Sequence, residues 1–310
     1  MRVLVLGGAG FIGLHLTRRL AEEGHAVTVV DDFSRGRRDE AVATLPIEVL
    51  SADLTDPAAY AALPHRWDQV YMLAAVVGVR NVEADPARVM RVNTLALMHL
   101  LDWLDGEPLF FASTSEAYAG GVGAGLVPVP TPENVPLVIE DIGAHRFAYA
   151  VSKLWGEAAV RHTAPHAVIG RFHNVYGPRM GADHVIPELS LRAVRGEDPF
   201  LLYGSDQTRA FCYVDDAVDA MIRLMGAPGA AGRIVHIGAG VETNIGDLAK
   251  LILRMAGMSP QLDPRPAPPG AVARRCPDIT LLRELTGFEP RVPLEEGVRR
   301  TFDWYREWWS

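Results

Sequence analysis

Short apolar runs alternate with longer amphipathic segments through the first half of the chain. The runs are rich in β-branched residues and read RVLVLG, AVTVVDD, IEVLSADL, QVYMLAA and PLFFASTS, beginning at residues 2, 26, 47, 69 and 108. Between the first two runs, residues 11–23 place Ile12, Leu16 and Leu20 on one helical stripe. Strands that alternate with helices predict an α/β fold with a parallel sheet covered by helices on both faces.

Other segments shape the expected organisation of the chain. Residues 86–104 are apolar almost all round, which fits either a core helix or a helix at a dimer interface. Residues 119–145 are rich in Gly and Pro and predict a long loop into the next helix, and long ordered loops are often functional. The C-terminal third has more prolines, arginines and short helical patterns. We expect a first domain at 1–174, rejoined by segments near 209–240, and a smaller lobe formed mainly by 175–310.

Charge and composition exclude several classes of protein. The 310 residues carry a formal charge of -8 with an isoelectric point near 5.7, so neither nucleic acid nor an anionic membrane is an expected partner. Cys212 and Cys276 lie far apart, and the ten histidines form no ligand cluster, so we predict no metal. The apolar run at the N-terminus ends in glycines, and no stretch is long enough to span a bilayer. We therefore expect a cytoplasmic protein.

The stretch VLVLGGAGFIG carries a glycine pattern typical of dinucleotide binding. Gly7, Gly10 and Gly13 follow the first predicted strand and open the next helix, where glycines allow a tight turn, the approach of a pyrophosphate and close packing of helix on strand. Asp31 ends the second strand, where a carboxylate accepts both ribose hydroxyls of NAD and repels the extra phosphate of NADP. Asp53 follows the third strand, either in reach of the adenine amino group or as a helix N-terminal acid. We predict NAD as the cofactor.

Tyr149 and Lys153 lie four residues apart in FAYAVSKLW, one turn apart on a helix face. Such a pair alone is usually part of an ordinary surface, but beside a nicotinamide cofactor it has a chemical use. An ammonium group and the positive nicotinamide ring would lower the pKa of the tyrosine from about 10 toward neutral pH. The phenolate could then accept a proton from a sugar or alcohol hydroxyl as hydride leaves. Polar side chains that could contact the same hydroxyl end the fifth strand at Ser113, Thr114, Ser115 and Glu116.

Taken together, these motifs resemble the extended short-chain dehydrogenase/reductases that modify nucleotide sugars. The likeness runs nearly end to end, through the glycine turn, Asp31, Asp53-Leu54, Leu73-Ala74-Ala75, Asn93, STSEAY, Tyr149 with Lys153, RFHNVYGPRM, YGSDQTRAFCYVDD and RRCPDI. The resemblance implies a Rossmann-type doubly wound parallel sheet that binds NAD, and a smaller C-terminal lobe that holds a nucleotide diphosphate sugar. It also implies a homodimer built on the helix at 86–104 and the helix that starts near 149.

The resemblance further assigns roles to individual residues. The implied catalytic residues are Tyr149, Lys153, Thr114, Ser115 and Glu116. The implied cofactor-binding residues are Gly7, Gly10, Phe11, Ile12, Gly13, Asp31, Asp32, Asp53, Leu54, Leu73, Ala74, Ala75, Asn93 and Ser113, together with Tyr149 and Lys153. The implied contacts to the sugar nucleotide are Asn174, Arg209 and Arg275. Planar guanidinium groups grip a diphosphate without requiring a protein that is basic overall.

Members of this family begin by oxidising carbon 4 of the sugar, and they differ in the next step. The ketone can take the hydride back on its other face, lose carbon dioxide when the sugar is a glucuronate, or eliminate water from carbon 6. The stretches TSE at 114–116, QTRAF and PDI resemble the decarboxylases, whereas His173, the loop at 119–145 and HVIPEL depart from them.

Epimerisation requires little beyond the shared catalytic groups and room for the sugar to turn. We therefore predict an NAD-dependent nucleotide-sugar 4-epimerase, with a UDP-glucuronate decarboxylase or an NDP-sugar 4,6-dehydratase as alternatives. A further alternative is a protein that binds NAD as a sensor and catalyses nothing. Such proteins typically lose the tyrosine or the lysine, and this chain keeps both.

Overall fold

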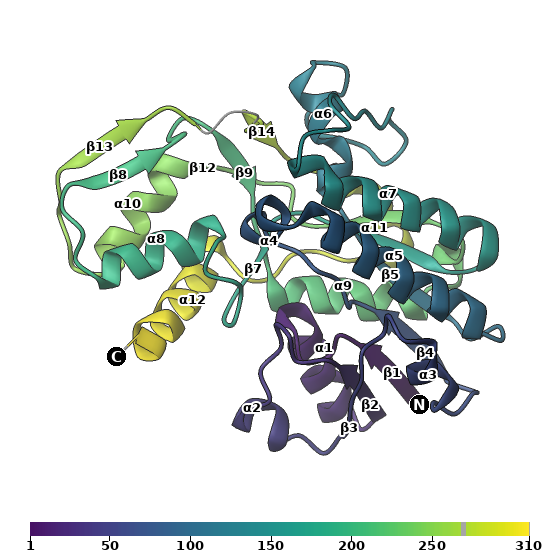
Figure 1. Ribbon diagram of the computed structural model, residues 1–310. Coiled ribbons are helices and arrows are strands. Elements are labelled where there is room, and N and C mark those ends of the chain that lie inside the picture. The colour runs from purple at the N-terminus through teal and green to yellow at the C-terminus, as the bar shows by residue number, and fades with distance from the viewer. Residues whose placement is uncertain (268–270, 310) are drawn as a thin grey trace.

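A parallel sheet of seven strands forms the centre of the larger unit (Figure 1). The computed structural model describes residues 1–267 and 271–309, the last of them by its backbone alone. The strand order is β11-β6-β5-β4-β1-β2-β3, and all neighbouring pairs are parallel. The strands are β1 Arg2–Leu6, β2 Ala26–Asp31, β3 Glu48–Ser51, β4 Gln69–Met72, β5 Leu109–Thr114, β6 Val168–Phe172 and β11 Ile234–Ile237. This order is doubly wound, which confirms the predicted Rossmann-type α/β fold.

Helices cover both faces of this sheet because the central strands are apolar on both sides. All residues of β4, and all but the first of β1, are buried, as expected for strands enclosed between two layers of helices. Helices α1 Phe11–Glu22 and α9 Val214–Gly226 pack together over one face. Helices α5 Pro86–Trp103 and α7 Arg146–Thr163 run side by side over the other (Figure 1). The apolar stretch predicted at 86–104 is therefore largely core, through Val89, Leu97 and Leu100.

Short elements connect these layers. They are α2 Glu40–Ala43, α3 Pro57–Ala61, α4 Val79–Ala84, η1 Ser115–Tyr118, η2 Pro228–Ala230 and α11 Thr280–Thr286. Helix α11 packs against α9 and β11, so the chain comes back to the larger unit after it has entered the smaller lobe. Within the described ranges, no helix combines the length and the apolar character of a bilayer-spanning segment.

The smaller lobe combines three helices with two small sheets. Strands β8 Phe200–Tyr203 and β13 Leu262–Arg265 form one sheet, and β12 Glu242–Asn244, β9 Thr208–Ala210 and β14 Arg274–Arg275 form the other. Helices α8 Val185–Val194, α10 Ile245–Met255 and α12 Leu294–Trp309 pack on one another and lie on the left in Figure 1. A two-stranded pairing of β7 Val175–Tyr176 with β10 Cys212–Tyr213 joins the lobe to the larger unit.

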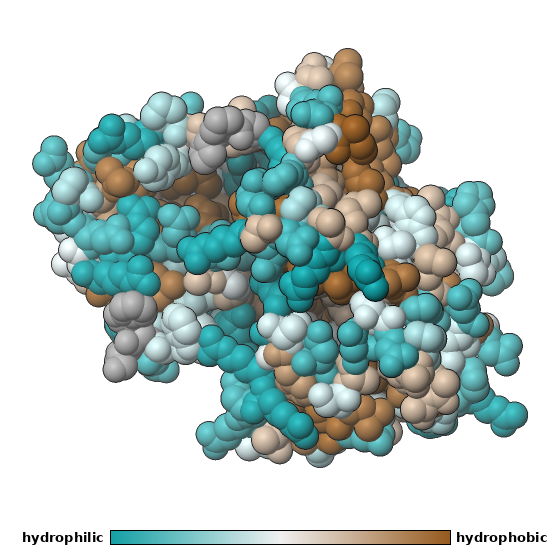
Figure 2. Space-filling view, viewed as in Figure 1, coloured by the Kyte–Doolittle hydropathy of each residue, from teal (hydrophilic) through white to brown (hydrophobic). Residues whose placement is uncertain are grey.

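The segment at 119–145 is not a loop throughout, as the sequence predicts, because it begins with helix α6 Ala119–Gly123. The glycines there serve close packing. A Cβ at Gly120 would lie 2.2 Å from the carbonyl oxygen of Val138, so only glycine lets the later part of the segment pack on the helix. The segment projects at the top of Figure 1, and Figure 2 shows apolar surface there. Leu126 and Ile142 are its most exposed large apolar side chains.

Candidate functional site

A cavity of about 290 Å³ lies at the carboxyl ends of the sheet strands, beside β1 and β4. The chain crosses there from one half of the sheet to the other, and open α/β sheets bind their ligands at such a switch point. The predicted cofactor residues that line the cavity are Gly7, Gly10, Asp31, Asp32, Asp53, Leu54, Leu73, Ala74 and Ala75. The fold therefore brings residues that are distant in the sequence together in the lining of one cavity.

The glycine turn fits the pyrophosphate of a dinucleotide. Gly7 has φ +85°, and a Cβ on it would lie 2.6 Å from the backbone nitrogen of Ala74. A Cβ on Gly13 would lie 2.1 Å from the carbonyl oxygen of Gly7, so helix and strand approach too closely for any side chain. At Gly10 the nearest atom is 3.3 Å away and the residue lines the cavity. Gly10 precedes α1 without a side-chain cap, so the N–H groups of Phe11 and Ile12 can bind an anion.

Asp31 is fixed at the end of β2 by two backbone hydrogen bonds. Its carboxylate accepts from the N–H of Ala9 and the N–H of Phe33, each at 2.9 Å. Burial raises the pKa of Asp31, and these two bonds lower it in part. Asp31 lines the cavity, and its carboxylate can still accept hydrogen bonds from a ribose diol. Arg35, which the site prediction omits, also lines the cavity, and the arginine-rich run after Asp31 was the available signal.

Three other predicted cofactor residues have different surroundings. Asp53 lines the cavity and accepts from Thr55, whereas Asp56 caps α3, so Asp53 is not the helix cap. Asn93 is not among the residues that line the cavity, and its amide holds both backbone groups of Val76 in place. Ser113 donates to the carboxylate of Glu157 inside the core. Asn93 and Ser113 therefore support the site from behind.

The catalytic residues predicted from the sequence meet at the ends of β5 and α7. Tyr149 and Thr114 share a side-chain hydrogen bond, and the Thr114 hydroxyl accepts from the N–H of Glu116 at 3.2 Å. Lys153 lies one turn beyond Tyr149 on α7 and is 4% exposed. The tyrosine, the hydroxyl and the amine are therefore gathered on the carboxyl edge of the sheet, as the family resemblance implies.

The expected lowering of the Tyr149 pKa by Lys153 is not seen in this structure. Burial and the carboxylate of Glu116 raise the pKa of the tyrosine, and the hydrogen bond with Thr114 offsets this only in part. Lys153 donates to the carbonyl oxygen of Ala112 at 2.8 Å, and burial lowers the pKa of its amine to about 8. The lowered tyrosine pKa stays a prediction for the protein with NAD bound.

Glu116 lies in a cluster of arginines. Its carboxylate accepts from Arg275 at 2.5 Å, and the positive charges of Arg146 and Arg209 act on it as well. Burial alone would raise the pKa of Glu116, but these guanidinium groups hold it below its usual range. The carboxylate is therefore ionised at neutral pH, and the arginines around it form a cationic surface beside Tyr149.

The small three-stranded sheet brings two predicted substrate residues together. Strands β9 and β14 run parallel with Arg209 opposite Arg275, although 66 positions separate them in the sequence. Arg209 donates to the Thr208 carbonyl at 2.7 Å, and burial together with the charge of Arg275 lowers its pKa to about 10. Asn174, the third predicted substrate residue, donates to the Ala210 carbonyl at 3.1 Å and has φ +41°. These contacts place all three at the junction of the two units.

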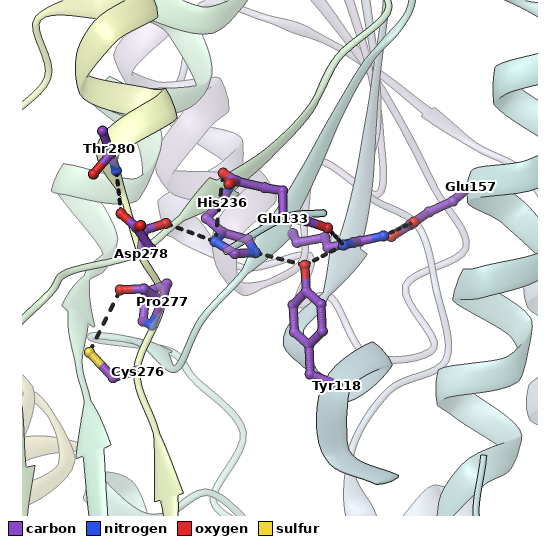
Figure 3. Close-up of polar contacts among 9 residues, drawn as sticks. Tyr118, Glu133, Glu157, His236, Cys276, Pro277, Asp278 and Thr280 are labelled. Carbon is purple, nitrogen blue, oxygen red and sulfur yellow. Dashed lines mark hydrogen bonds and ion pairs between the residues drawn. The ribbon is translucent and has the colours of Figure 1, made fainter. Parts of the chain in front are cut away.

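A buried polar network behind α7 is absent from the site prediction. Arg171 on β6 donates to both carboxylate oxygens of Glu157 on α7, at 2.8 and 2.6 Å. It also donates to the Tyr118 hydroxyl and to the Glu133 carbonyl. Figure 3 shows Tyr118, Glu133 and Glu157 converging on one point from separate segments. Because Glu157 lies one turn beyond Lys153, the network fixes the helix that carries the predicted catalytic residues Tyr149 and Lys153.

His236 extends this network, and its hydrogen bonds define its tautomer. Its Nδ1 lies 2.9 Å from the carbonyl oxygen of Asp278, which can only accept, so Nδ1 carries the proton. Its Nε2 lies 2.8 Å from the hydroxyl of Tyr118, which then donates to it (Figure 3). Burial lowers the pKa of His236 to about 4, so the ring is neutral near pH 7 and its approach to Glu133 is no ion pair there.

His173 follows β6 directly and lies beside this network. Its ring is 4.5 Å from that of His236, centre to centre, and 1% of the residue is exposed. The predicted site residues do not include His173, although it departs from the decarboxylase pattern in the sequence. Together with Ser115, Thr131 and Arg275 it lines a second, narrow hollow. Thr131 comes from the 119–145 segment, as does part of the remaining wall, so this segment reaches the site.

Comparison with known proteins identifies relatives along the whole chain. The chain is 33% identical over 324 residues to a UDP-N-acetyl-α-D-glucosaminuronate decarboxylase of Bacillus cytotoxicus, covering 99% of this chain and 98% of the relative. It is 32% identical over 318 residues to UDP-glucuronic acid decarboxylase 1 of Xenopus tropicalis, covering 99% and 72%. The structure of a UDP-glucose 4-epimerase from Thermotoga maritima, solved with UDP-glucose, matches all of both chains with a TM-score of 0.87 and 29% identity.

A family model agrees with these matches and with the geometry of the site. The model of the NAD dependent epimerase/dehydratase family matches residues 3–238, a range that includes the glycine turn, Asp31, Tyr149 and Lys153. Structural relatives of the chain have been solved with NAD or NADH. The motif-based prediction of the family and of the cofactor is confirmed. The chain belongs to the NAD-dependent epimerase/dehydratase family.

Proposed function

We propose that this protein is an NAD-dependent decarboxylase of a nucleotide-linked hexuronate. The observation that carries the proposal is the ion pair of Glu116 with Arg275 next to Tyr149, with Arg209 on the neighbouring strand. Guanidinium groups bind carboxylates through paired hydrogen bonds. The sequence predicts a 4-epimerase, with a decarboxylase as an alternative. The two decarboxylase relatives support the decarboxylase over the 4-epimerase.

In the proposed reaction, oxidation at carbon 4 comes first. Tyr149 accepts the proton of the 4-hydroxyl, Thr114 hydrogen-bonds the same oxygen, and the Lys153 cation stabilises the phenolate. NAD held by the glycine turn and Asp31 would supply the redox chemistry, as the acceptor and later the donor of one hydride. Lys153 is buried one turn beyond Tyr149, which is itself only partly exposed.

Carbon dioxide leaves next. The new ketone makes the group on carbon 5 a β-keto carboxylate. The bond between carbons 5 and 6 breaks, and its electron pair forms an enolate whose charge rests on the oxygen of carbon 4. Tyr149, now protonated, and Thr114 hydrogen-bond this oxygen, which stabilises the developing charge. A proton then adds at carbon 5, and hydride return to carbon 4 with proton return from Tyr149 gives a nucleotide-linked pentose.

Glu116 orients Arg275 in this scheme and does not donate the proton. Its lowered pKa means that it is ionised at neutral pH. An ionised Glu116 holds one edge of the Arg275 guanidinium, and the other donors meet the carboxylate of the substrate. With Glu116 ionised, we assign the proton for carbon 5 to a solvent-exchangeable source, so deuterated water labels that carbon.

The test is product analysis in deuterated water. The purified protein is incubated with NAD and with UDP-glucuronate, UDP-N-acetylglucosaminuronate or UDP-glucose. The carbon dioxide released is measured, and the sugar products are identified by proton NMR. We expect carbon dioxide and a pentose with deuterium at carbon 5 from at least one hexuronate, and neither from the control variant Tyr149→Phe. Inversion of carbon 4 without carbon dioxide would establish a 4-epimerase, and loss of water from carbon 6 a dehydratase. If no sugar gives a product, the alternative of a protein that binds NAD as a sensor without catalysis would be supported.

The proposed homodimer rests on the outer faces of α5 and α7. Met98 on α5 and Trp155 on α7 are among the exposed large apolar side chains. Two parallel helices with such residues suit a four-helix contact with a second copy. Light scattering of the purified protein measures the mass directly, and a mass near 33.8 kDa would contradict the proposal.

A further inference from the structure

His173 is buried without using either of its ring nitrogens. It is 1% exposed, and neither Nδ1 nor Nε2 has a hydrogen-bond partner among the residues that the structure describes. Buried polar side-chain atoms are nearly always hydrogen-bonded, and leaving one unsatisfied costs about 1–3 kcal/mol. The neighbouring His236 satisfies both of its nitrogens. The ring of His173 is therefore prepared for a partner that is not part of the described chain.

The ring lines a hollow next to the catalytic strand. Ser115, Thr131 and Arg275 line the same hollow. It has room for about one oxygen-sized group, with a volume near 10 Å³. Tyr118, Ala119, Val122 and Val272 also line it, so much of the wall is apolar. The Thr131 hydroxyl already donates to the Pro128 carbonyl. The donors left for one oxygen atom are the Arg275 guanidinium, the Ser115 hydroxyl and the His173 imidazole.

Strand register explains why His173 lies there. Strands β5 and β6 are parallel neighbours, with Thr114 opposite Phe172. The next residue on each strand is Ser115 and His173, so both extend beyond the same edge of the sheet as the proposed catalytic Thr114. The backbone N–H of His173 donates to Ile237 on β11 at 2.9 Å, which holds the residue in line with the sheet. Its position relative to the sugar is therefore set by the same strands that set Thr114.

The surroundings keep the imidazole neutral. Burial, the ring of His236 and the positive charges of Arg275 and Arg171 all lower the pKa of His173. A neutral imidazole has one N–H donor and one acceptor nitrogen. A carboxylate or ether oxygen can only accept, so the N–H is the group that would serve it.

We propose that His173 is a specificity-determining residue that donates a hydrogen bond to an oxygen of the substituent on sugar carbon 5. The inference rests on the proposed function, because the hollow adjoins Arg275, which meets the hexuronate carboxylate there. Ser115 and Arg275 share the recognition of this oxygen. A pentose product lacks the group, so His173 distinguishes substrate from product.

The experiment compares three ligands that differ only at carbon 5. UDP-glucuronate carries a carboxylate there, UDP-glucose a hydroxymethyl group and UDP-xylose a hydrogen. Their affinities are measured by calorimetry on the NAD-loaded Tyr149→Phe protein, which cannot turn them over, with and without His173→Phe. Phenylalanine keeps an aromatic ring in place and removes both nitrogens. A hydrogen bond to a charged group predicts a loss of about 10- to 100-fold for UDP-glucuronate and less than about twofold for UDP-xylose.

Two further variants separate recognition from damage to the core. Tyr118→Phe keeps the ring that lines the hollow and stacks on His173. It removes only the hydroxyl that serves His236 and Arg171, so it should weaken all three ligands equally or not at all. His173→Gln returns an N–H donor and should recover part of the affinity for UDP-glucuronate. Recovery of affinity in His173→Gln supports a hydrogen bond from residue 173. Equal losses of affinity for the three ligands in His173→Phe overturn the proposal. A crystal structure with UDP-glucuronate in which His173 contacts only a water would also overturn it.

The outcome is distinct from that of the proposed function. If the unmodified protein releases no carbon dioxide, the decarboxylase proposal fails. His173→Phe would then still support the inference by weakening UDP-glucose relative to UDP-xylose. If carbon dioxide is released but the three affinities change together, the role of His173 fails and the decarboxylase stands.

Discussion

Replacing Arg171 with methionine is expected to destabilise the protein more than the loss of a surface ion pair. Arg171 is 2% exposed, and its partner Glu157 is 4% exposed. The guanidinium donates twice to that carboxylate and also to Tyr118 and Glu133. Methionine retains much of the apolar volume but leaves the carboxylate buried without a cation. Removing one partner of a buried ion pair costs about 3–5 kcal/mol.

This cost corresponds to a measurable change in melting temperature. Unfolding entropy is about 2.1 cal/mol/K per residue, which gives about 0.65 kcal/mol/K for 310 residues. A loss of about 3–5 kcal/mol therefore lowers the Tm by about 5–8 °C. Scanning calorimetry of the NAD-loaded protein measures the shift, and urea unfolding measures the free energy independently.

The matched control is an ion pair of similar length on the surface. Arg19 and Glu23 form an exposed pair at 2.5 Å on one helix, so Arg19→Met should cost about 0.3–0.5 kcal/mol. The double variant Arg171→Met with Glu157→Gln removes both charges. Its loss should be smaller than the sum of the two single losses, since each single change leaves a buried charge alone. A cost for Arg171→Met no greater than that of Arg19→Met, or single losses that simply add, would refute the reasoning.

Two further predictions concern the cofactor and the catalytic base. Gly13→Ala should weaken NAD binding by more than about 10-fold, because its Cβ would lie 2.1 Å from the Gly7 carbonyl oxygen. Gly226→Ala is the control, since a Cβ there has no atom within 4 Å. Fluorescence titration with NAD measures the affinity of both variants. Glu116→Gln removes a negative charge that raises the pKa of Tyr149, so that pKa should fall. NAD reduction is followed at 340 nm in a single turnover at several pH values. The acidic limb of this pH profile should move to lower pH. A limb that stays in place or moves to higher pH contradicts the effect of Glu116 on Tyr149.

The glycine turn could be predicted from the sequence because its geometry is local. Gly7, Gly10 and Gly13 act within one strand, one turn and one helix, and each close approach there requires a missing side chain. The same signal is misleading at residues 119–145, where the glycines predict a loop and the structure begins with a helix. In the structure Gly120 allows a later segment to pack on a helix, and a contact of that kind has no local sequence pattern.

The polar network behind α7 could not be predicted because its parts are far apart in sequence. Arg171 and Glu157 carry charges that composition alone assigns to the surface, and only the fold brings them together in the core. Asn93 shows a second limit. A family pattern marks it as part of the cofactor site, but only coordinates reveal that its amide acts on the backbone of Val76.

The charges around Arg209 bear directly on which sugar the pocket prefers. Burial and the charge of Arg275 lower the pKa of Arg209 to about 10, so its positive charge is disfavoured where it lies, although it remains protonated at neutral pH. Arg275 shares its charge with Glu116, whereas Arg209 donates to the neutral oxygens of Thr208 and Gln207. An anionic ligand beside these guanidinium groups would relieve the repulsion between them. A nucleotide-linked hexuronate brings a carboxylate as well as a diphosphate, and a neutral hexose brings only the diphosphate. The electrostatics of this cluster therefore support the hexuronate of the proposed function over a neutral hexose.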